Sequence, residues 1–224
     1  MSIHDRSLPA LDAVFPATDG IGLTSAARNG ISVKRVLDVI LSLAALVLLS
    51  PVFILIALAI VLDSRGPVFF RQRRTGRHGK IFSIYKFRTM HVLEDGDDIV
   101  QATRNDRRTT AVGRFLRRFS LDEFPQLLNV LKGEMSLVGP RPHAVAHDEY
   151  YLQMVPTYRF RFYAKPGITG LAQIRGFRGE VRDIAHMEER IACDLEYIQN
   201  WSLADDIVIL IKTVISLPFH RTAY

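Results

Sequence analysis

An apolar run that is broken near its centre constrains this chain more than any other feature. Residues 39–62 read VILSLAALVLLSPVFILIALAIVL and carry no charge. As a helix they would extend roughly 36 Å, and a bilayer core takes about 20 apolar residues. Pro51 removes one helical hydrogen bond, and the Ser50 hydroxyl can bond a freed carbonyl. The run therefore predicts a membrane-inserted helix that bends at Ser50-Pro51.

Charges on both sides of this run bear on its topology. Lys34 and Arg35 precede it, and six cations follow it within a short stretch: Arg65, Arg71, Arg73, Arg74, Arg77 and Lys80. Cytoplasmic flanks carry the excess of positive charge. A helix that enters, bends and leaves on the same face satisfies both flanks, whereas a straight crossing satisfies mainly the C-terminal one. The residues favour a re-entrant helix over 31–64, with a crossing helix as the alternative.

The remainder of the chain has the composition of a basic domain beside a tail. The 224 residues include 29 Lys and Arg against 23 Asp and Glu, a balance that suits nucleic acid, a membrane surface or a phosphorylated substrate. The one cysteine, Cys193, excludes an internal disulfide and offers no metal cluster. Residues 1–30 mix Pro, Gly, Ser and Ala without periodicity, which predicts a disordered tail. A cytosolic domain would then occupy residues 65–224.

Two short strands with a Gly-rich basic turn are expected after the apolar run. The segments VFF (68–70) and IFSIYKF (81–87) have strand composition. Lys86 and Arg88 lie two residues apart and would share one face of a strand. Two cations on one face can hold a diphosphate. A solvated basic strand near anionic lipid is the alternative.

An acidic pair begins the next expected helix. Ser120 and Glu123 have the spacing of a capping box, and Phe119 and Phe124 that of a hydrophobic staple. Carboxylates in a first turn also suit the helix dipole. Local structure alone can therefore account for Glu123 and its neighbour Asp122. The alternative is that the two acids form a chemical pair.

Two arginines flank that pair in the sequence. Arg117 ends the helical segment AVGRFLRR (111–118), five residues before Asp122, and could point into the same site. Arg141 lies between Pro140 and Pro142 in SLVGPRPH, where the prolines stiffen an extended arm. A guanidinium on such an arm suits bidentate phosphate contact, with a plain surface turn as the alternative.

The C-terminal third is expected to be mainly helical. Ile191, Leu195 and Ile198 form one apolar stripe, which predicts core packing. The run IVILI at 207–211 is too short to span a bilayer. Either an interfacial helix or a helix packed on the core is compatible with it.

The motifs, taken in order, resemble the monotopic phosphoglycosyl transferase family of bacterial sugar transferases. They are KRVLDV, the Ser-Pro break, YKFRTM, GRFLRRFSLDEFPQLLNVLKGEMSLVGPRP, KPGITGLAQI and DLEYIQNWSL. The resemblance covers about residues 33–224; Phe124 departs from the leucine usual at that position. It implies an α+β fold, mainly helical, with an N-terminal re-entrant membrane helix broken at Ser50-Pro51. A small cytosolic catalytic domain with short strands and amphipathic interfacial helices would follow.

The resemblance also implies a reaction. A sugar 1-phosphate would pass from a UDP-sugar to undecaprenyl phosphate with release of UMP, through a covalent phosphosugar intermediate. Asp122 would be the nucleophile and Glu123 the ligand of Mg²⁺. The substrate phosphates and nucleotide would contact five residues: Lys86, Arg88, Arg117, Pro140 and Arg141.

A subgroup is indicated as well. GPRPHAVAHDEYY, GFRGE and the terminal RTAY resemble members that begin exopolysaccharide synthesis with glucose 1-phosphate; galactose or another sugar is the alternative. The expected location is the cytoplasmic face of a bacterial inner membrane, in contact with its lipid, without nucleic acid. A homodimer is one option for the oligomeric state. A non-catalytic, membrane-anchored adapter is the competing class, although such an adapter would be expected to have lost some of the site residues.

Overall fold

The computed structural model describes residues 25–91, 103 and 106–216. The first half contains α2 (Ser25–Leu48), α3 (Ser50–Asp63), β1 (Phe69–Thr75), the 3₁₀ turn η2 (Arg77–Gly79), β2 (Ile81–Phe87), α4 (Ala111–Arg118), η3 (Leu121–Gln126) and α5 (Leu127–Lys132). The second half contains β3 (Ser136–Val138), α6 (Val145–Met154), η4 (Tyr158–Tyr163), β4 (Gly167–Thr169), α7 (Leu171–Ile174), α8 (Ile184–Gln199) and α9 (Leu203–Ser216).

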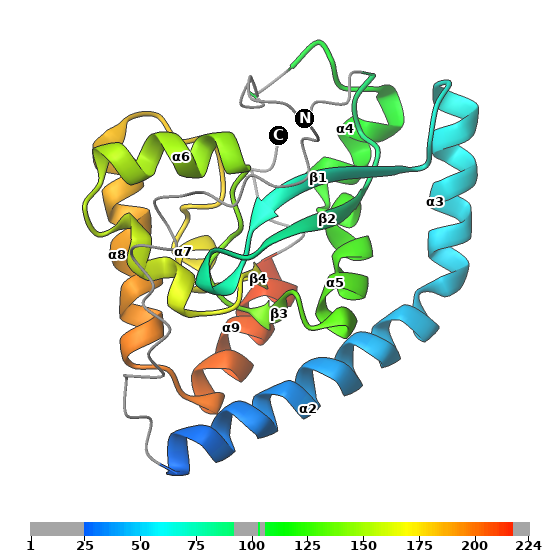
Figure 1. Cartoon of the computed structure of the whole chain (residues 1–224). Coiled ribbons are helices and arrows are strands. Elements are labelled where there is room, and N and C mark those ends of the chain that lie inside the picture. Colours follow the sequence, from blue (N-terminus) through cyan, green and yellow to red (C-terminus); the bar gives the residue numbers. More distant parts are fainter. Residues whose placement is uncertain (1–24, 92–102, 104–105, 217–224) are drawn as a thin grey trace, which may run out of the picture.

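A two-stranded hairpin crosses the middle of the molecule, with helices around it (Figure 1). Strands β1 and β2 are antiparallel, and their register runs from Phe69 opposite Phe87 to Thr75 opposite Ile81. A second, parallel pair joins β3 to β4. Helices α6 and α8 lie at one side of the hairpin and α3 at the other. The prediction of a mainly helical fold with short strands is confirmed, and both predicted hairpin strands are present.

The apolar run forms two helices that bend sharply at the predicted position. Segments 33–48 and 50–63 meet at 61°, and the Ser50 hydroxyl donates to the Val47 carbonyl over 2.8 Å. Within the described ranges, neither helix alone has the length and apolar character to cross a bilayer, whereas the bent pair together has both. Most apolar side chains of the pair are exposed, including Leu48 at 78% and Leu62 at 77%.

Helix α2 is attached to the domain through the polar residues of KRVLDV. Lys34 Nζ lies 2.6 Å from Asp206 Oδ2 in α9. Arg35 donates to the carbonyls of Val130 and Leu131 at the end of α5. Asp38 accepts from the backbone of Leu137 over 3.0 Å. Lys34 and Arg35, predicted as a charged flank of the membrane segment, thus also hold α2 against the domain.

Helix α2 begins within the segment that the sequence assigned to the tail. Residues 25–30, which the sequence assigned to the tail, form the first turns of α2. Its other residues, 1–24, lie outside the part of the chain that the structure describes. Helix α2 therefore starts before the predicted boundary at residue 31.

Helix α3 packs one face against the domain and leaves the other uncovered. Ile56 and Ile60 are buried against Phe87 of β2 and Leu116 of α4. A second cluster joins α6, η4 and α8, with Tyr158 and Ile191 among its members. The predicted stripe on α8 is confirmed as core, since Leu195 packs on this cluster and Ile198 on a third.

Arg88 connects the end of α3 to the end of β2. Its guanidinium donates to the carbonyls of Arg65 and Ser64, the latter over 2.6 Å, and its side chain is 2% exposed. These carbonyls follow the last turn of α3, where backbone acceptors lack helical partners. Gly66 makes room for this contact. It has a φ of +125°, and a Cβ there would lie 2.2 Å from Arg88 Nη1.

Candidate active site

The acidic pair sits in a 3₁₀ turn whose entry differs from the predicted capping box. Ser120 adopts the left-handed conformation (φ 57°, ψ 22°), and its side chain makes no capping hydrogen bond. The Ser120 backbone donates to Arg117, and its carbonyl accepts from Glu123 N over 3.2 Å. Arg141 Nη2 and Lys86 Nζ instead hold Glu123 Oε1. The capping-box prediction is therefore wrong.

The predicted hydrophobic staple is also replaced. Phe119 packs on Phe115, with ring centroids 5.0 Å apart. Phe124 faces Phe53 of α3 at 6.1 Å. Phe53 in turn meets Phe87 edge-on at 5.5 Å. The aromatic residue after the acids thus packs the turn against the apolar helix.

Three cations surround Glu123, whose side chain is buried. Lys86 Nζ lies 2.9 Å from Glu123 Oε1. Arg141 contacts both oxygens, at 2.5 Å and 3.2 Å. Arg178 Nη2 lies 3.2 Å from Oε2. Burial by itself would raise the pKa of Glu123, but the charges of Arg141, Lys86 and Arg178 outweigh it and hold the pKa well below the usual value of 4.5.

Asp122 has a different environment. It is 8% exposed, and the described residues give its carboxylate no hydrogen bond. Burial raises the pKa of Asp122 above its usual 3.8; the neighbouring charge of Lys86 works in the opposite direction, and that of Glu123 in the same one. Burial also lowers the pKa of Lys86, with the positive charge of Arg141 adding to the effect. Asp122 is therefore a poorly solvated carboxylate, and the neighbouring Glu123 carboxylate is bound by three cations.

The structure brings together most, but not all, of the predicted residues. Lys86, Asp122, Glu123 and Arg141 form one cluster, and the charge of Arg117 is close enough to lower the pKa of Asp122. Pro140 is buried, and its carbonyl accepts from Gly167 N over 2.8 Å, which fixes the arm that carries Arg141.

Arg88 lies apart from the cluster, because its guanidinium holds the carbonyls after α3. Strand β2 ends at Phe87, so Lys86 and Arg88 do not present a shared strand face to one site. The prediction that they hold the same diphosphate has no support in the geometry.

Arg178 was missing from the predicted site. It lies in the GFRGE loop, between Gly176 and Gly179, far from the acids in sequence. The sequence marks this loop as basic and Gly-flanked, and as part of the resemblance to the glucose subgroup, but not as a partner of the acids. Nothing local indicates that its guanidinium reaches Glu123.

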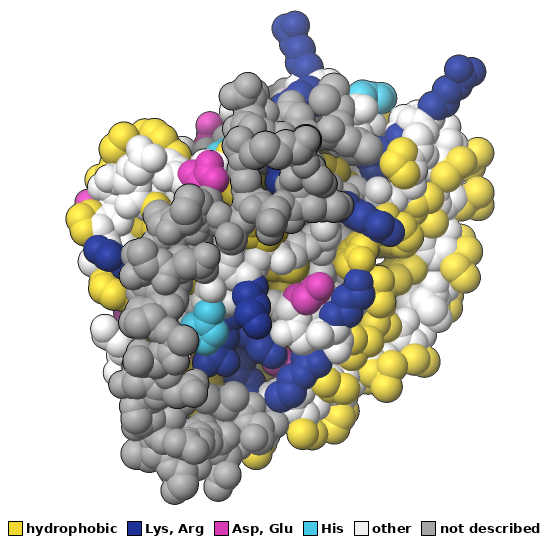
Figure 2. All heavy atoms as spheres, in the orientation of Figure 1, with side chains coloured by type: hydrophobic (Ala, Val, Ile, Leu, Met, Phe, Trp, Pro, Cys, Tyr) yellow, Lys and Arg dark blue, Asp and Glu magenta, His cyan; other side chains and the backbone are white. Residues whose placement is uncertain are grey.

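Figure 2 shows Lys and Arg side chains gathered in a hollow near the centre of one face, with apolar side chains beside it.

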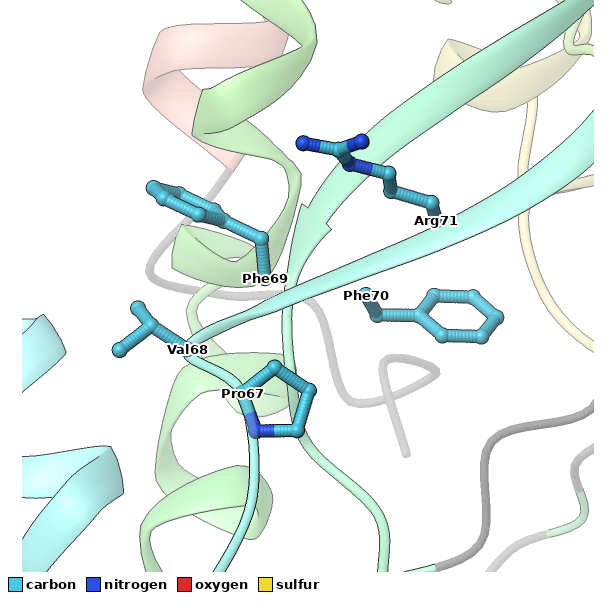
Figure 3. A pocket seen from close by; sticks show the side chains of 5 residues that line it. All are labelled: Pro67, Val68, Phe69, Phe70 and Arg71. Atoms are coloured by element: carbon cyan, nitrogen blue, oxygen red, sulfur yellow. The ribbon is translucent and has the colours of Figure 1, made fainter.

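A separate, open cavity of about 420 Å³ lies where the chain leaves α3 and enters β1. Pro67, Val68, Phe69, Phe70 and Arg71 line it, with Phe70 pointing away from Phe69 (Figure 3). It shares no lining residue with the carboxylate cluster. The two are neighbours through the hairpin, since Phe70 pairs with Lys86.

The donor set for a metal is small. No three His, Cys, Asp or Glu side chains gather at a metal-sized spacing within the described ranges. Mg²⁺ is commonly bound by one or two carboxylates together with substrate phosphates and water. Glu123, the predicted ligand, fits that role only with a phosphorylated ligand, which would also draw Arg141, Arg178 and Lys86 from Glu123 to its own oxygens.

A phosphate-handling site agrees best with this arrangement. A carboxylate without hydrogen bonds can act as a nucleophile. Cations around it offset the repulsion between that carboxylate and an anionic substrate. The buried positions of both acids keep these charges in a medium where they interact more strongly than in water.

The chain belongs to the bacterial sugar transferase family, whose profile matches residues 29–220. Among its relatives is a UDP-glucose:undecaprenyl-phosphate glucose-1-phosphate transferase of Caulobacter vibrioides. It is 55% identical over 191 residues, which cover 85% of this chain and 72% of the relative. A transferase of the same name from Escherichia coli is 53% identical over 191 residues, 85% of this chain but 41% of the relative. An exopolysaccharide production protein of Rhizobium leguminosarum is 47% identical over 187 residues, 82% of this chain and 94% of the relative.

Proposed function

We propose that this protein transfers glucose 1-phosphate from UDP-glucose to undecaprenyl phosphate, as the first step of exopolysaccharide biosynthesis. The names of its relatives support the substrates. The observation that carries the proposal is the contrast between the two acids. Glu123 is held by three cations, while Asp122 beside it has no hydrogen bond from the described residues.

Asp122 is the nucleophile in this proposal. Its carboxylate attacks the phosphorus that carries the sugar, and the bond to the UMP oxygen breaks. The resulting aspartyl phosphosugar then reacts with the phosphate of the lipid. A new P–O bond forms, and the aspartate leaves as a carboxylate. Covalent catalysis divides an exchange between two large anions into two displacements at one site.

The cations stabilise the charge of the diphosphate during both steps. Lys86, Arg141 and Arg178, which hold Glu123 without substrate, bind phosphate oxygens when the nucleotide enters. Glu123 would hold Mg²⁺ together with the substrate phosphates. The bound cation would neutralise negative charge that develops on the leaving UMP.

The bent helix pair provides the membrane contact of this proposal. The pair and α9 expose many large apolar side chains, as a surface in contact with lipid would. We place the pair in the lipid as a re-entrant helix, with both ends on the cytoplasmic face of a bacterial inner membrane. The lipid substrate would then present its phosphate at the level of the site.

UMP release and protein labelling test the reaction. Purified protein with Mg²⁺ and undecaprenyl phosphate should release UMP from UDP-glucose faster than from UDP-galactose. Without the lipid, intact-protein mass spectrometry should detect one phosphoglucose adduct, which Asp122→Asn abolishes. No UMP release from any UDP-sugar would overturn the proposed enzyme. An undiminished adduct in Asp122→Asn would exclude Asp122 as the nucleophile.

Cysteine accessibility tests the topology. Single cysteines at exposed Val33 and Arg65, in a Cys193→Ser background, lie at the two ends of the pair. A membrane-impermeant maleimide should label both in inverted vesicles and neither in intact spheroplasts. Labelling from opposite sides would show a crossing helix instead.

A further inference from the structure

A buried polar cluster lies behind the active site, and no step of the proposed reaction uses it. It consists of side chains that are at most 8% exposed: His143, Asp148, Tyr158, Arg161, Arg190 and Asp194. They come from the segment after Arg141 and from α6, η4 and α8. Burying charges is costly unless they are paired and hydrogen-bonded. The contacts of this cluster show where its two arginines are directed.

Arg161 holds the backbone at Arg141, one of the three cations around Glu123. Its Nη2 donates to the carbonyl of Arg141 over 2.5 Å. The same nitrogen lies 3.0 Å from Asp194 Oδ2, and the guanidinium lies over the Tyr158 ring at 5.0 Å. Tyr158 donates to Asp148 over 2.6 Å. Asp194 and Tyr158 therefore fix the guanidinium of Arg161, which in turn binds the main chain at Arg141.

Arg190 holds the backbone beside Arg178, another of the cations around Glu123. Its Nη2 donates over 2.7 Å to the carbonyl of Gly179, the residue directly after Arg178. Its Nη1 lies 3.4 Å from His143 Nε2, and the other ring nitrogen of His143 lies 2.8 Å from Arg161 Nη1. One imidazole thus lies between the two arginines.

The surroundings of His143 favour the neutral imidazole. Burial lowers its pKa well below the usual 6.5, and the charges of Arg161 and Arg190 add to the effect. A neutral ring can stay between two guanidiniums without repelling them. The cluster thereby joins two loops that lie far apart in sequence and that meet at Glu123.

We infer that Arg161 and Arg190 are positioning residues that fix the backbone of the two loops carrying Arg141 and Arg178, and so set the spacing of the cations that receive the diphosphate. The inference rests on the proposed function. Arginine suits the role because one planar guanidinium can bond a partner on each edge. A lysine keeps the charge but presents a single nitrogen, so it cannot hold the loop in the same place.

Arg190→Lys is the first variant, and Arg175→Lys is its matched control. Arg175 makes an exposed ion pair with Glu196 of α8, the helix that carries Arg190. Within the described part of the chain, neither Arg175 nor Glu196 contacts Glu123 or its three cations. Arg190→Lys should raise the KM for UDP-glucose about tenfold, with a smaller fall in kcat and an unchanged circular dichroism spectrum. Arg175→Lys should leave both constants unchanged.

A double-mutant cycle with Arg178→Ala separates positioning from general stability. If Arg190 acts through Arg178, Arg190→Lys should change the KM by less than about twofold once Arg178 is gone. A normal KM in Arg190→Lys, or an equal KM increase with and without Arg178, would overturn the inference. Arg161→Lys provides the same cycle with Arg141→Ala if Arg190→Lys does not fold. Unfolding of both lysine variants would also overturn it, since the arginines would then be required for the fold itself.

Wild-type activity keeps the two proposals apart. A wild type that releases no UMP from UDP-glucose would overturn the proposed function before any variant is made. A wild type that is active, with additive effects of the two substitutions, would overturn the positioning role alone.

Discussion

Arg141 holds both carboxylate oxygens of Glu123, with its Nη2 atom 2.5 Å from Oε1 and its Nη1 atom 3.2 Å from Oε2. The pair is a two-point contact from a proline-bounded arm to a buried acid. An arginine fork fits a carboxylate and a phosphate in the same way. In the proposed reaction, Arg141 would therefore present the same two donors to a phosphate of the substrate.

Arg141→Lys should lower kcat/KM for UDP-glucose by about 10- to 100-fold, since a single ammonium cannot replace a two-point contact. Steady-state UMP release over a range of UDP-glucose concentrations measures it. Arg159→Lys is the control, because Arg159 is exposed and its contacts are local: it donates to the Pro156 carbonyl and lies over the Phe160 ring. Equal kinetics in wild type and Arg141→Lys would contradict a phosphate role for this arm.

The rate of adduct formation should depend on pH in a bell shape. Asp122 must be ionised to attack, and its pKa is raised by burial, so the rate should rise with pH through a value above 3.8. Lys86 must be protonated to offset charge, and burial lowers its pKa, so the rate should fall through a value below 10.5. Rapid-quench labelling with UDP-glucose measures both limbs.

Lys86→Arg provides the control for the alkaline limb of that profile. An arginine stays charged throughout the range, so the fall at high pH should disappear while the acid limb remains. An alkaline limb that is the same in Lys86→Arg would assign it to another group.

Gly66→Ala should lower the free energy of unfolding by about 2–4 kcal/mol. The substitution adds a Cβ at a φ of +125°, 2.2 Å from Arg88 Nη1. Gly176→Ala is the matched control: its φ is +96°, but a Cβ there would meet nothing within 4 Å. It should cost only the backbone strain, on the order of 1 kcal/mol. Thermal unfolding in detergent compares them, and equal losses would show that the contact with Arg88 contributes nothing.

Ser120→Gly should raise the melting temperature, whereas Ser120→Ala should leave it nearly unchanged. The left-handed backbone of Ser120 costs about 1 kcal/mol in any residue except glycine and a few others. A capping box would instead predict a loss of stability in both variants, because alanine and glycine both remove the hydroxyl. A clear loss of stability in both variants would restore the capping role.

Features that depend on neighbours in sequence were predictable. The break at Ser50-Pro51, the hairpin strands and the helix at 111–118 follow from proline geometry, residue alternation and apolar spacing. The acidic pair was also identified, although the local motif suggested the wrong partners for Glu123. Its true partners come from β2, from the arm after β3 and from the loop before α8. Such contacts are set by the packing of distant segments, which no short window of sequence contains.

Arg88 illustrates the same limit from the other direction. Its motif suggested a phosphate ligand, but the side chain is directed toward the carbonyls that follow α3. The sequence holds no sign of that choice, because those carbonyls belong to a different segment and are free only once the helix has ended.

The same residue has a mechanical consequence. Arg88 donates to the Ser64 carbonyl at the end of α3, and Lys86, two positions earlier, donates to Glu123. A single short piece of chain therefore joins the apolar helix to the carboxylate cluster. With α3 in the lipid as proposed, the immersion depth of that helix sets the height of the carboxylates above the bilayer. The enzyme would then hold Asp122 at a fixed height above the bilayer. The membrane itself would place the phosphate of the lipid substrate at that same height.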